Sequence, residues 1–85
     1  MSKEEYAKKL EILKRLAHEQ WGSLLNCVMN YLLTKGYTNI GISTEKPNAI
    51  IAKDKDGSDI TITLEDVIED IIQFADEHKA RVLLE

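Results

Sequence analysis

The feature that most constrains the fold is an almost unbroken helical pattern over residues 2–35. Apolar side chains recur there at spacings of three and four, which places them on one side of an α-helix. They are Tyr6, Leu10, Leu13, Ala17, Trp21, Leu24, Val28 and Tyr31. A continuous helix of this length would span roughly 50 Å, whereas a compact domain of this chain length is only about 30 Å wide. Such a helix has to break, protrude or pack against a second chain.

Two interpretations of this segment compete at Gly22-Ser23. Glycine destabilises a helix interior by about 1 kcal/mol relative to alanine, and Gly/Ser pairs are known kink sites. Because the apolar spacing continues in phase through the glycine, we favour one continuous helix over two helices that turn near Trp21. A helix of that length predicts a homodimer. The predicted self-association surface is the apolar seam of Tyr6, Leu10, Leu13, Ala17, Trp21, Leu24 and Val28.

The rest of the chain predicts an antiparallel meander followed by a second helix. Three short runs separated by turn-forming sequences have strand character: residues 39–43, 49–53 and 59–62. Thr63 then begins a capping box with Asp66 and opens a helix that we expect to run to about His78. The predicted fold is one α+β domain over residues 1–85, with the order α-β-β-β-α.

Composition and charge limit the class of protein. The chain is 44% apolar and 31% charged, which is typical of a folded domain. Its net charge of −4 is concentrated in residues 43–85, which disfavours a dominant role in binding nucleic-acid phosphates. No apolar run approaches the length of a membrane helix. The single Cys27 lies between apolar neighbours and predicts a small buried side chain in a reducing compartment, so we expect a cytoplasmic protein.

No combination of residues predicts catalysis. His18 and His78 lie on different predicted helices, and Cys27 is about two and a half turns from His18 on another face. The sequence has no glycine-rich phosphate loop, zinc-ligand spacing or nucleophile elbow. The acidic hairpin around Gly57 departs from a calcium-binding loop at three required positions, so it predicts a turn. We therefore expect no enzyme activity, no metal and no cofactor.

An acidic band on the last predicted helix is the one surface that suggests a protein partner. It consists of Glu65, Asp66, Glu69 and Asp70. A solvated face is the default interpretation, because acids near a helix N-terminus also favour the helix dipole. Recognition of a basic partner is the functional alternative. We favour a small non-enzymatic partner-binding protein, similar in size and acidity to inhibitors, immunity proteins and phage or mobile-element anti-defence proteins, a link made by analogy alone.

Two other functions stay open at this point. The first is a small-ligand or nucleotide-binding module with a pocket between protomers. Its candidate polar residues, near the expected junction of helix and sheet, are Asn26, Asn30, Lys35, Ser43 and Thr44. The second is a nucleic-acid-associated regulator that uses the weakly basic first helix. It is the least favoured, because glutamates interrupt the lysines and the aromatic residues lie mostly within the apolar seam.

Overall fold

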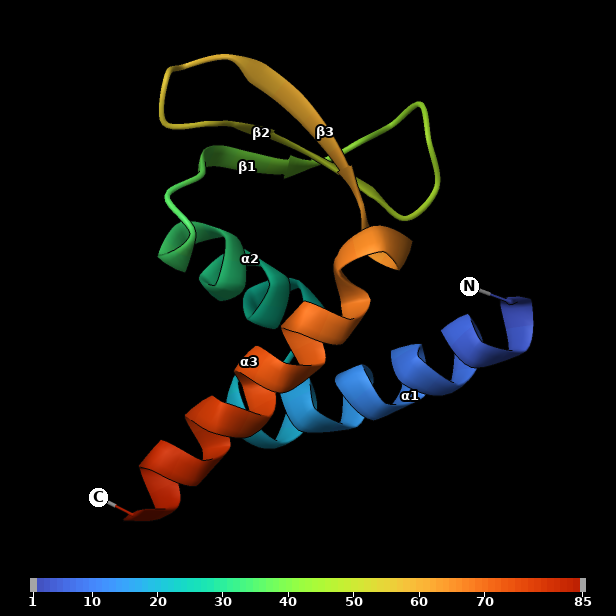
Figure 1. Ribbon diagram of the computed structural model, residues 1–85, viewed down its shortest axis with the longest axis vertical. Helices are drawn as coiled ribbons and strands as arrows, with labels where there is room; N and C mark the ends of the chain where they lie inside the picture. Colours follow the sequence, from blue (N-terminus) through green and yellow to red (C-terminus); the bar gives the residue numbers. More distant parts are fainter. Residues whose placement is uncertain (1, 85) are drawn as a thin grey trace.

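The protein is described by a computed structural model that covers the backbone of residues 2–84 and the side chains of residues 2–81. Within these residues the order of elements is α-α-β-β-β-α (Figure 1). The helices are α1 (Lys3–Gln20), α2 (Leu24–Thr34) and α3 (Leu64–Leu84), and the strands are β1 (Thr38–Ile42), β2 (Ala49–Lys53) and β3 (Asp59–Thr63). The α+β class, the antiparallel meander and the C-terminal helix are confirmed.

The continuous helix predicted over residues 2–35 is wrong, because the chain turns between α1 and α2. Gly22 adopts a φ of +79°, a left-handed conformation that glycine reaches without a steric penalty. Ser23 is extended, and its hydroxyl accepts a hydrogen bond from the backbone N–H of Asn26 at 3.2 Å, which caps α2. The Asn26 side-chain amide donates to the carbonyl oxygen of Trp21 at 3.1 Å and so ties the two helices together.

The apolar spacing continues through this turn because α1 and α2 both bury their apolar side within the same molecule. Periodicity reports which residues are buried, and not whether the backbone between them is continuous. Folded back at the turn, the two helices fit within a molecule that measures 37 × 32 × 19 Å. The mismatch in length that predicted a second chain is therefore absent.

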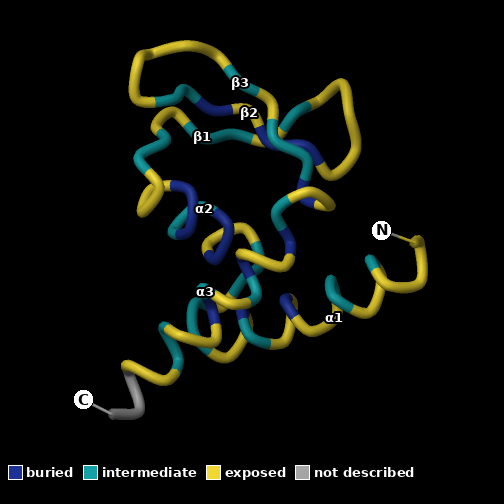
Figure 2. The backbone as a smooth tube through the Cα atoms, in the orientation of Figure 1, coloured by how far each residue is buried: buried dark blue, intermediate teal, exposed yellow. Residues whose placement is uncertain are grey.

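Buried residues of all three helices and β2 form the core, and Figure 2 marks the buried positions along the backbone. Its members are Leu13, Ala17, Cys27, Val28, Tyr31, Leu32, Ile50, Leu64, Ile68, Ile71 and Ala75. The apolar seam that we assigned to self-association contributes to this core: Leu13, Ala17 and Val28 are buried. The other four seam residues, Tyr6, Leu10, Trp21 and Leu24, are half-buried and pack against it.

The sheet has the order β1-β2-β3, and the helices cover one of its faces (Figure 1). Ile50 of β2 lies opposite Ile62 of β3, and both side chains contribute to the packing against the helices. The register of β1 shifts between Thr38 and Gly41, where Asn39 adopts a φ of +50°. The sheet brings the start of α3 next to the end of α2, and this junction forms the candidate site.

The C-terminal helix begins where the sequence predicts and ends later. The Thr63 hydroxyl donates to the Asp66 carboxylate at the first turn of α3, a bond between side chains that differs from the side-chain-to-backbone bonds of the predicted capping box. The helix continues past His78 to Leu84. Lys79 forms an ion pair with Glu19 of α1, which holds the added turns against the first helix.

Candidate functional site

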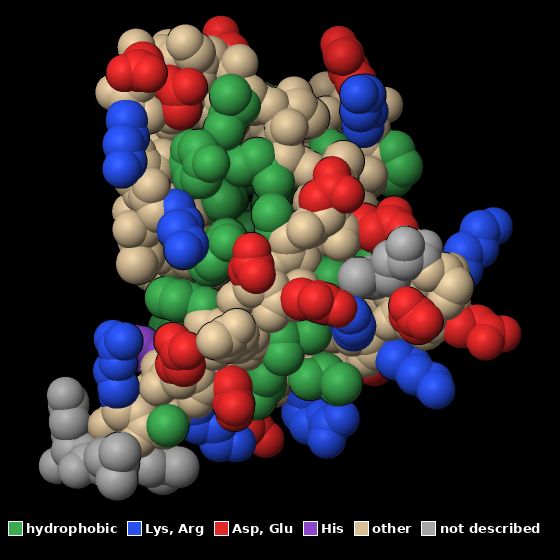
Figure 3. All heavy atoms as spheres, in the orientation of Figure 1, with side chains coloured by type: hydrophobic (Ala, Val, Ile, Leu, Met, Phe, Trp, Pro, Cys, Tyr) green, Lys and Arg blue, Asp and Glu red, His purple; other side chains and the backbone are tan. Residues whose placement is uncertain are grey.

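Two adjoining hollows of about 440 Å³ each lie where the end of α2 meets α3 and the sheet. Tyr31 and Lys35 line both of them, so we treat them as one feature, the Tyr31 groove. Its principal lining side chains are Tyr31, Lys35, Tyr37, Asp66, Asp70 and Phe74. Figure 3 shows apolar side chains gathered between the sheet and α3, with acidic side chains following α3 along their edge.

Tyr31 is the centre of the groove. It is buried with the apolar side of α2 and is only 6% exposed. The Phe74 ring meets it edge-on, with ring centroids 5.6 Å apart. Lys35 follows one turn later, and its ammonium lies 5.7 Å from the Tyr31 ring centroid, within the range of a cation–π contact. Burial, followed by the nearby charge of Asp70, raises the pKa of Tyr31 above its usual value.

Phe74 also packs against the rings of Trp21 and His78. The Trp21 ring stacks on Phe74 with centroids 6.2 Å apart, and His78 lies 4.7 Å from Trp21. Trp21 therefore belongs to the support of the groove as well as to the apolar seam. His78 is engaged in this aromatic cluster, in which it contacts no nucleophile.

The four residues of the acidic band divide into two pairs. Glu65 and Glu69 face α1: Glu69 forms an ion pair with Lys9, and the charge of Glu65 contributes to the raised pKa of Tyr6. Asp66 and Asp70 instead line the Tyr31 groove. The band is thus neither one uniform solvated face nor one uniform binding surface, because neighbouring acids on a helix point in different directions.

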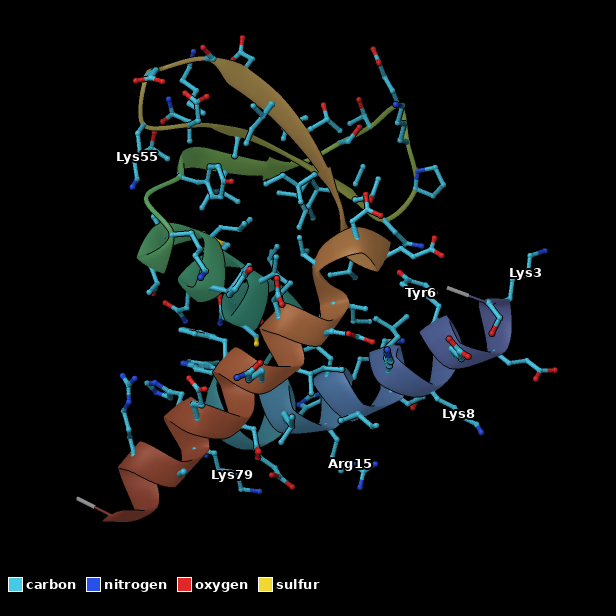
Figure 4. The ribbon with its side chains drawn as sticks, in the orientation of Figure 1. Lys3, Tyr6, Lys8, Arg15, Lys55 and Lys79 are labelled. Carbon is cyan, nitrogen blue, oxygen red and sulfur yellow. The ribbon has the colours of Figure 1, made fainter. Side chains whose placement is uncertain are left out.

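Three basic side chains of α1 point away from the rest of the molecule. Figure 4 shows Lys3, Lys8 and Arg15 directed away from the rest of the chain, while Lys79 of α3 points toward α1. Glutamates alternate with these cations along α1, as the sequence indicates. None of the three cations lines the Tyr31 groove.

The residues proposed for a ligand pocket do not come together. Lys35 lines the Tyr31 groove, whereas Asn26 and Asn30 take part in local hydrogen bonds of α2. Ser43 accepts hydrogen bonds from backbone N–H groups in the β1–β2 loop, and with Thr44 it lines a separate shallow hollow beside Ile51. A pocket built from all five residues is absent within one chain.

Sequence reasoning missed the aromatic part of the groove. Tyr31 and Phe74 follow the helical spacing of core residues, which gives no sign that one edge of each ring borders a groove. One signal was available: Lys35 follows Tyr31 by four residues, a spacing that brings two side chains together on a helix. Tyr37, just beyond Gly36, has no comparable signal.

The burial of Cys27 disfavours its use as a nucleophile. Cys27 is fully buried, and desolvation raises the pKa of its thiol to about 11, which keeps it protonated at neutral pH. Among residues 2–81, no group of three or more His, Cys, Asp or Glu side chains is placed to hold a metal ion. None of the helices of the described chain combines the length and apolar character needed to cross a membrane.

Comparisons of the chain with protein-family models, curated proteins and solved structures find no match. Its function is therefore inferred from the groove itself.

Proposed function

We propose that the protein acts without catalysis, by binding a basic protein partner through the Tyr31 groove. The observation that supports this proposal is the position of Asp66 and Asp70, which stand along one wall of an open groove. Aromatic rings of Tyr31 and Phe74 form part of the same surface. Aromatic side chains are enriched in protein interfaces, and charge complementarity at their rim steers association.

The shape of the groove favours a protein segment as the bound species. In the hollow that contains Asp70, the polar wall continues along α3 through Gln73, Glu77 and Arg81. A groove of this kind can take a strand, loop or helix of another protein along its length. The acidic wall would attract basic residues of that segment from a distance, with a strength that falls as salt is added.

We propose that the biological role is that of an inhibitor or antagonist that covers a basic surface of its target, as anti-defence and immunity proteins do. The small size and the negative charge suit that role by analogy. A cytoplasmic location is part of the proposal, because the single unpaired cysteine suits a reducing compartment.

A selection from a random peptide display library tests the groove. The parent protein should enrich peptides with several Lys or Arg residues. A variant with Asp70→Lys and Glu77→Lys should lose this enrichment, and its association with a selected peptide should be at least about tenfold slower at low salt. The matched control, Glu11→Lys with Glu45→Lys, changes the net charge equally but lies outside the groove, so it should keep most of the binding.

Two results would overturn the proposal. One is a parent selection without any preference for basic peptides. The other is an unchanged association rate in the variant reversed at Asp70 and Glu77. In either case we would favour the small-ligand alternative, because Lys35 lines the Tyr31 groove. A rise in melting temperature on addition of a metabolite or nucleotide would support that alternative.

We also propose that the protein self-associates, through a different surface from the one that the sequence suggested. The seam residues pack within the chain, but α2 exposes Leu25 and Leu33 and has no charged residue along its length. Charge depletion with exposed apolar side chains is typical of the centre of an interface.

A further inference from the structure

We infer that the Tyr31 groove holds the cationic end of a lysine or arginine side chain of the partner, and that Lys35 occupies this place in the free protein. The inference rests on the proposed partner-binding function and names the group that the site recognises. The observation behind the inference is that a cation of the chain itself, the ammonium group of Lys35, already lies over the ring of Tyr31.

The contact between Lys35 and Tyr31 joins a fixed group to an exposed one. Tyr31 is 6% exposed and its ring is packed against Phe74, so the ring stays in place. Lys35 is an exposed residue at the end of α2, on a long and flexible side chain. Its ammonium lies 5.7 Å from the centroid of that ring. A second cation can therefore take the same position when Lys35 swings outward.

No carboxylate among residues 2–81 forms an ion pair with Lys35. The ion pairs within that part of the chain are Lys9–Glu69, Lys14–Glu11, Lys53–Asp59 and Lys79–Glu19. The position of Lys35 thus depends on its contact with the Tyr31 ring and on attraction to the acidic side chains that line the groove. Such a contact is weak enough at an exposed site to exchange with a ligand.

The charges around the ring favour a positive ligand once Lys35 has moved. Asp66 and Asp70 are one turn apart on α3, and they line the two hollows that share Tyr31. Arg81 lines the hollow that contains Asp70, together with the carboxylate of Glu77, and it does not line the hollow that contains Asp66. Without Lys35, the site combines two carboxylates with an aromatic surface, which is the chemistry that binds ammonium and guanidinium groups.

Competition between Lys35 and a ligand sets the size of the expected effect. A cation–π contact at an exposed site is populated about 70–85% of the time, given its usual strength. A ligand that needs the same place can bind only the molecules in which Lys35 has left the ring. Its apparent affinity is therefore reduced in proportion to that free fraction. Removal of Lys35 should therefore raise the affinity for a cationic ligand about threefold to sixfold.

The test is an NMR titration with three short blocked peptides, acetyl-Gly-Lys-Gly-amide, acetyl-Gly-Arg-Gly-amide and the neutral acetyl-Gly-Gln-Gly-amide. The variant Lys35→Ala should bind the two cationic peptides about threefold to sixfold more tightly than the parent, with shifts at the ring protons of Tyr31. The control Lys46→Ala removes an equal charge from the β1–β2 loop, and it should leave the affinity unchanged. Adding Asp70→Asn to Lys35→Ala should lower the affinity again.

Three results would overturn the inference. They are equal affinities for parent and Lys35→Ala, equal gains in Lys35→Ala and Lys46→Ala, and equal binding of the neutral peptide. These results differ from a failure of the proposed function. A groove that binds the cationic peptides, in a protein whose display selection enriches no basic sequence, would retain the inferred site and remove the protein partner.

Discussion

At the residue scale, two buried polar groups, the hydroxyl of Tyr6 and the thiol of Cys27, show how burial without a partner changes stability and ionisation. The hydroxyl of Tyr6 is buried and has no hydrogen-bond partner among the described residues. Burial, followed by the charge of Glu65, raises its pKa. Figure 4 places Tyr6 on the first turns of α1, near the start of α3. A hydroxyl in this position has lost its water without gaining a protein acceptor, which is costly.

We therefore predict that Tyr6→Phe leaves the protein equally stable or makes it up to about 1 kcal/mol more stable. The change keeps the ring that packs against the core and removes only the unpaired polar atom. The free energy of unfolding in urea measures the effect. Tyr31→Phe is the control, because the Tyr31 hydroxyl has Asp70 nearby and its loss should give no gain. A loss of more than about 1 kcal/mol in Tyr6→Phe would mean that the hydroxyl has an acceptor in solution.

The buried thiol of Cys27 predicts a fall in stability at alkaline pH. Its pKa is raised from 9.0 to about 11 by desolvation. Between these two values the unfolded chain releases the thiol proton while the folded chain keeps it. The native state then binds more protons, so the free energy of unfolding decreases as the pH rises. Tyr6 and Tyr31, whose pKa values are raised from 10.0, act in the same direction at higher pH.

Urea unfolding at pH 7, 9 and 10 tests this prediction, with Cys27→Ala as the comparison. The parent should lose stability from about pH 9 upward, and the variant should start its decline only when the tyrosines ionise. The variant will be less stable at pH 7 because a buried side chain has been shortened, so the pH dependence is the quantity to compare. Parallel curves from pH 9 would show that Cys27 ionises freely in the folded protein.

At the scale of elements, α2 has a buried side and an exposed side with little difference in composition. Leu32 is 1% exposed, whereas its neighbour Leu33 is 53% exposed. Leu32→Ala should cost about 2–5 kcal/mol of unfolding free energy, because the truncation leaves a cavity in the core. Leu33→Ala makes the same change of side chain at an exposed position, so it should cost less than about 0.5 kcal/mol of unfolding free energy. Denaturant midpoints of the two variants decide the matter, and similar midpoints would contradict the position of α2 in the structure.

The elements also show what the sequence can predict. β2 is predicted to the residue because its apolar run is bounded by strong turn signals, and α3 begins directly after Thr63, as expected. The break at Gly22 could not be predicted, because the apolar spacing continues in phase and only a positive φ distinguishes the turn from a kink. The choice between one continuous helix and two helices thus depends on the local conformation of Gly22 and on the cap that Ser23 provides.

The site was predicted in separate pieces. Asp66, Asp70 and Lys35 all appear among the sequence-based candidates, but under two different functions. The structure brings them to the two hollows of one groove, Asp66 to one hollow, Asp70 to the other and Lys35 to both. Which side of α3 faces α1 and which faces the groove depends on tertiary packing, so Glu65 and Glu69 could not be separated from their neighbours by sequence alone.

At the scale of the whole molecule, the packing of α1 on α3 redistributes the charge of the two halves of the chain. Lys9 pairs with Glu69 and Lys79 pairs with Glu19, so ion pairs link the two helices at two levels. Part of the positive charge of α1 is thereby matched within the molecule. The wall of the Tyr31 groove keeps acids that face solvent, and these are the charges that the proposed basic partner would meet.

Self-association is the last prediction, and it belongs to the molecule as a whole. Each copy has a net charge of −4, and two copies repel each other least where their contact surface carries no charge. The exposed side of α2 meets that condition, with Leu25 44% exposed and Leu33 53% exposed. Light scattering at micromolar concentration should give about twice the 9.7 kDa chain mass.

The variant Leu25→Lys with Leu33→Lys should then scatter as a monomer, because each dimer would bury four uncompensated charges. Ile12→Lys is the control: it adds a charge at an exposed apolar position of α1, outside the α2 surface, and should leave the mass unchanged. The double variant should also keep the groove intact, since neither leucine lines it. A monomer mass for the parent at every concentration up to the millimolar range would exclude the dimer, and the exposed leucines of α2 would then be ordinary surface residues.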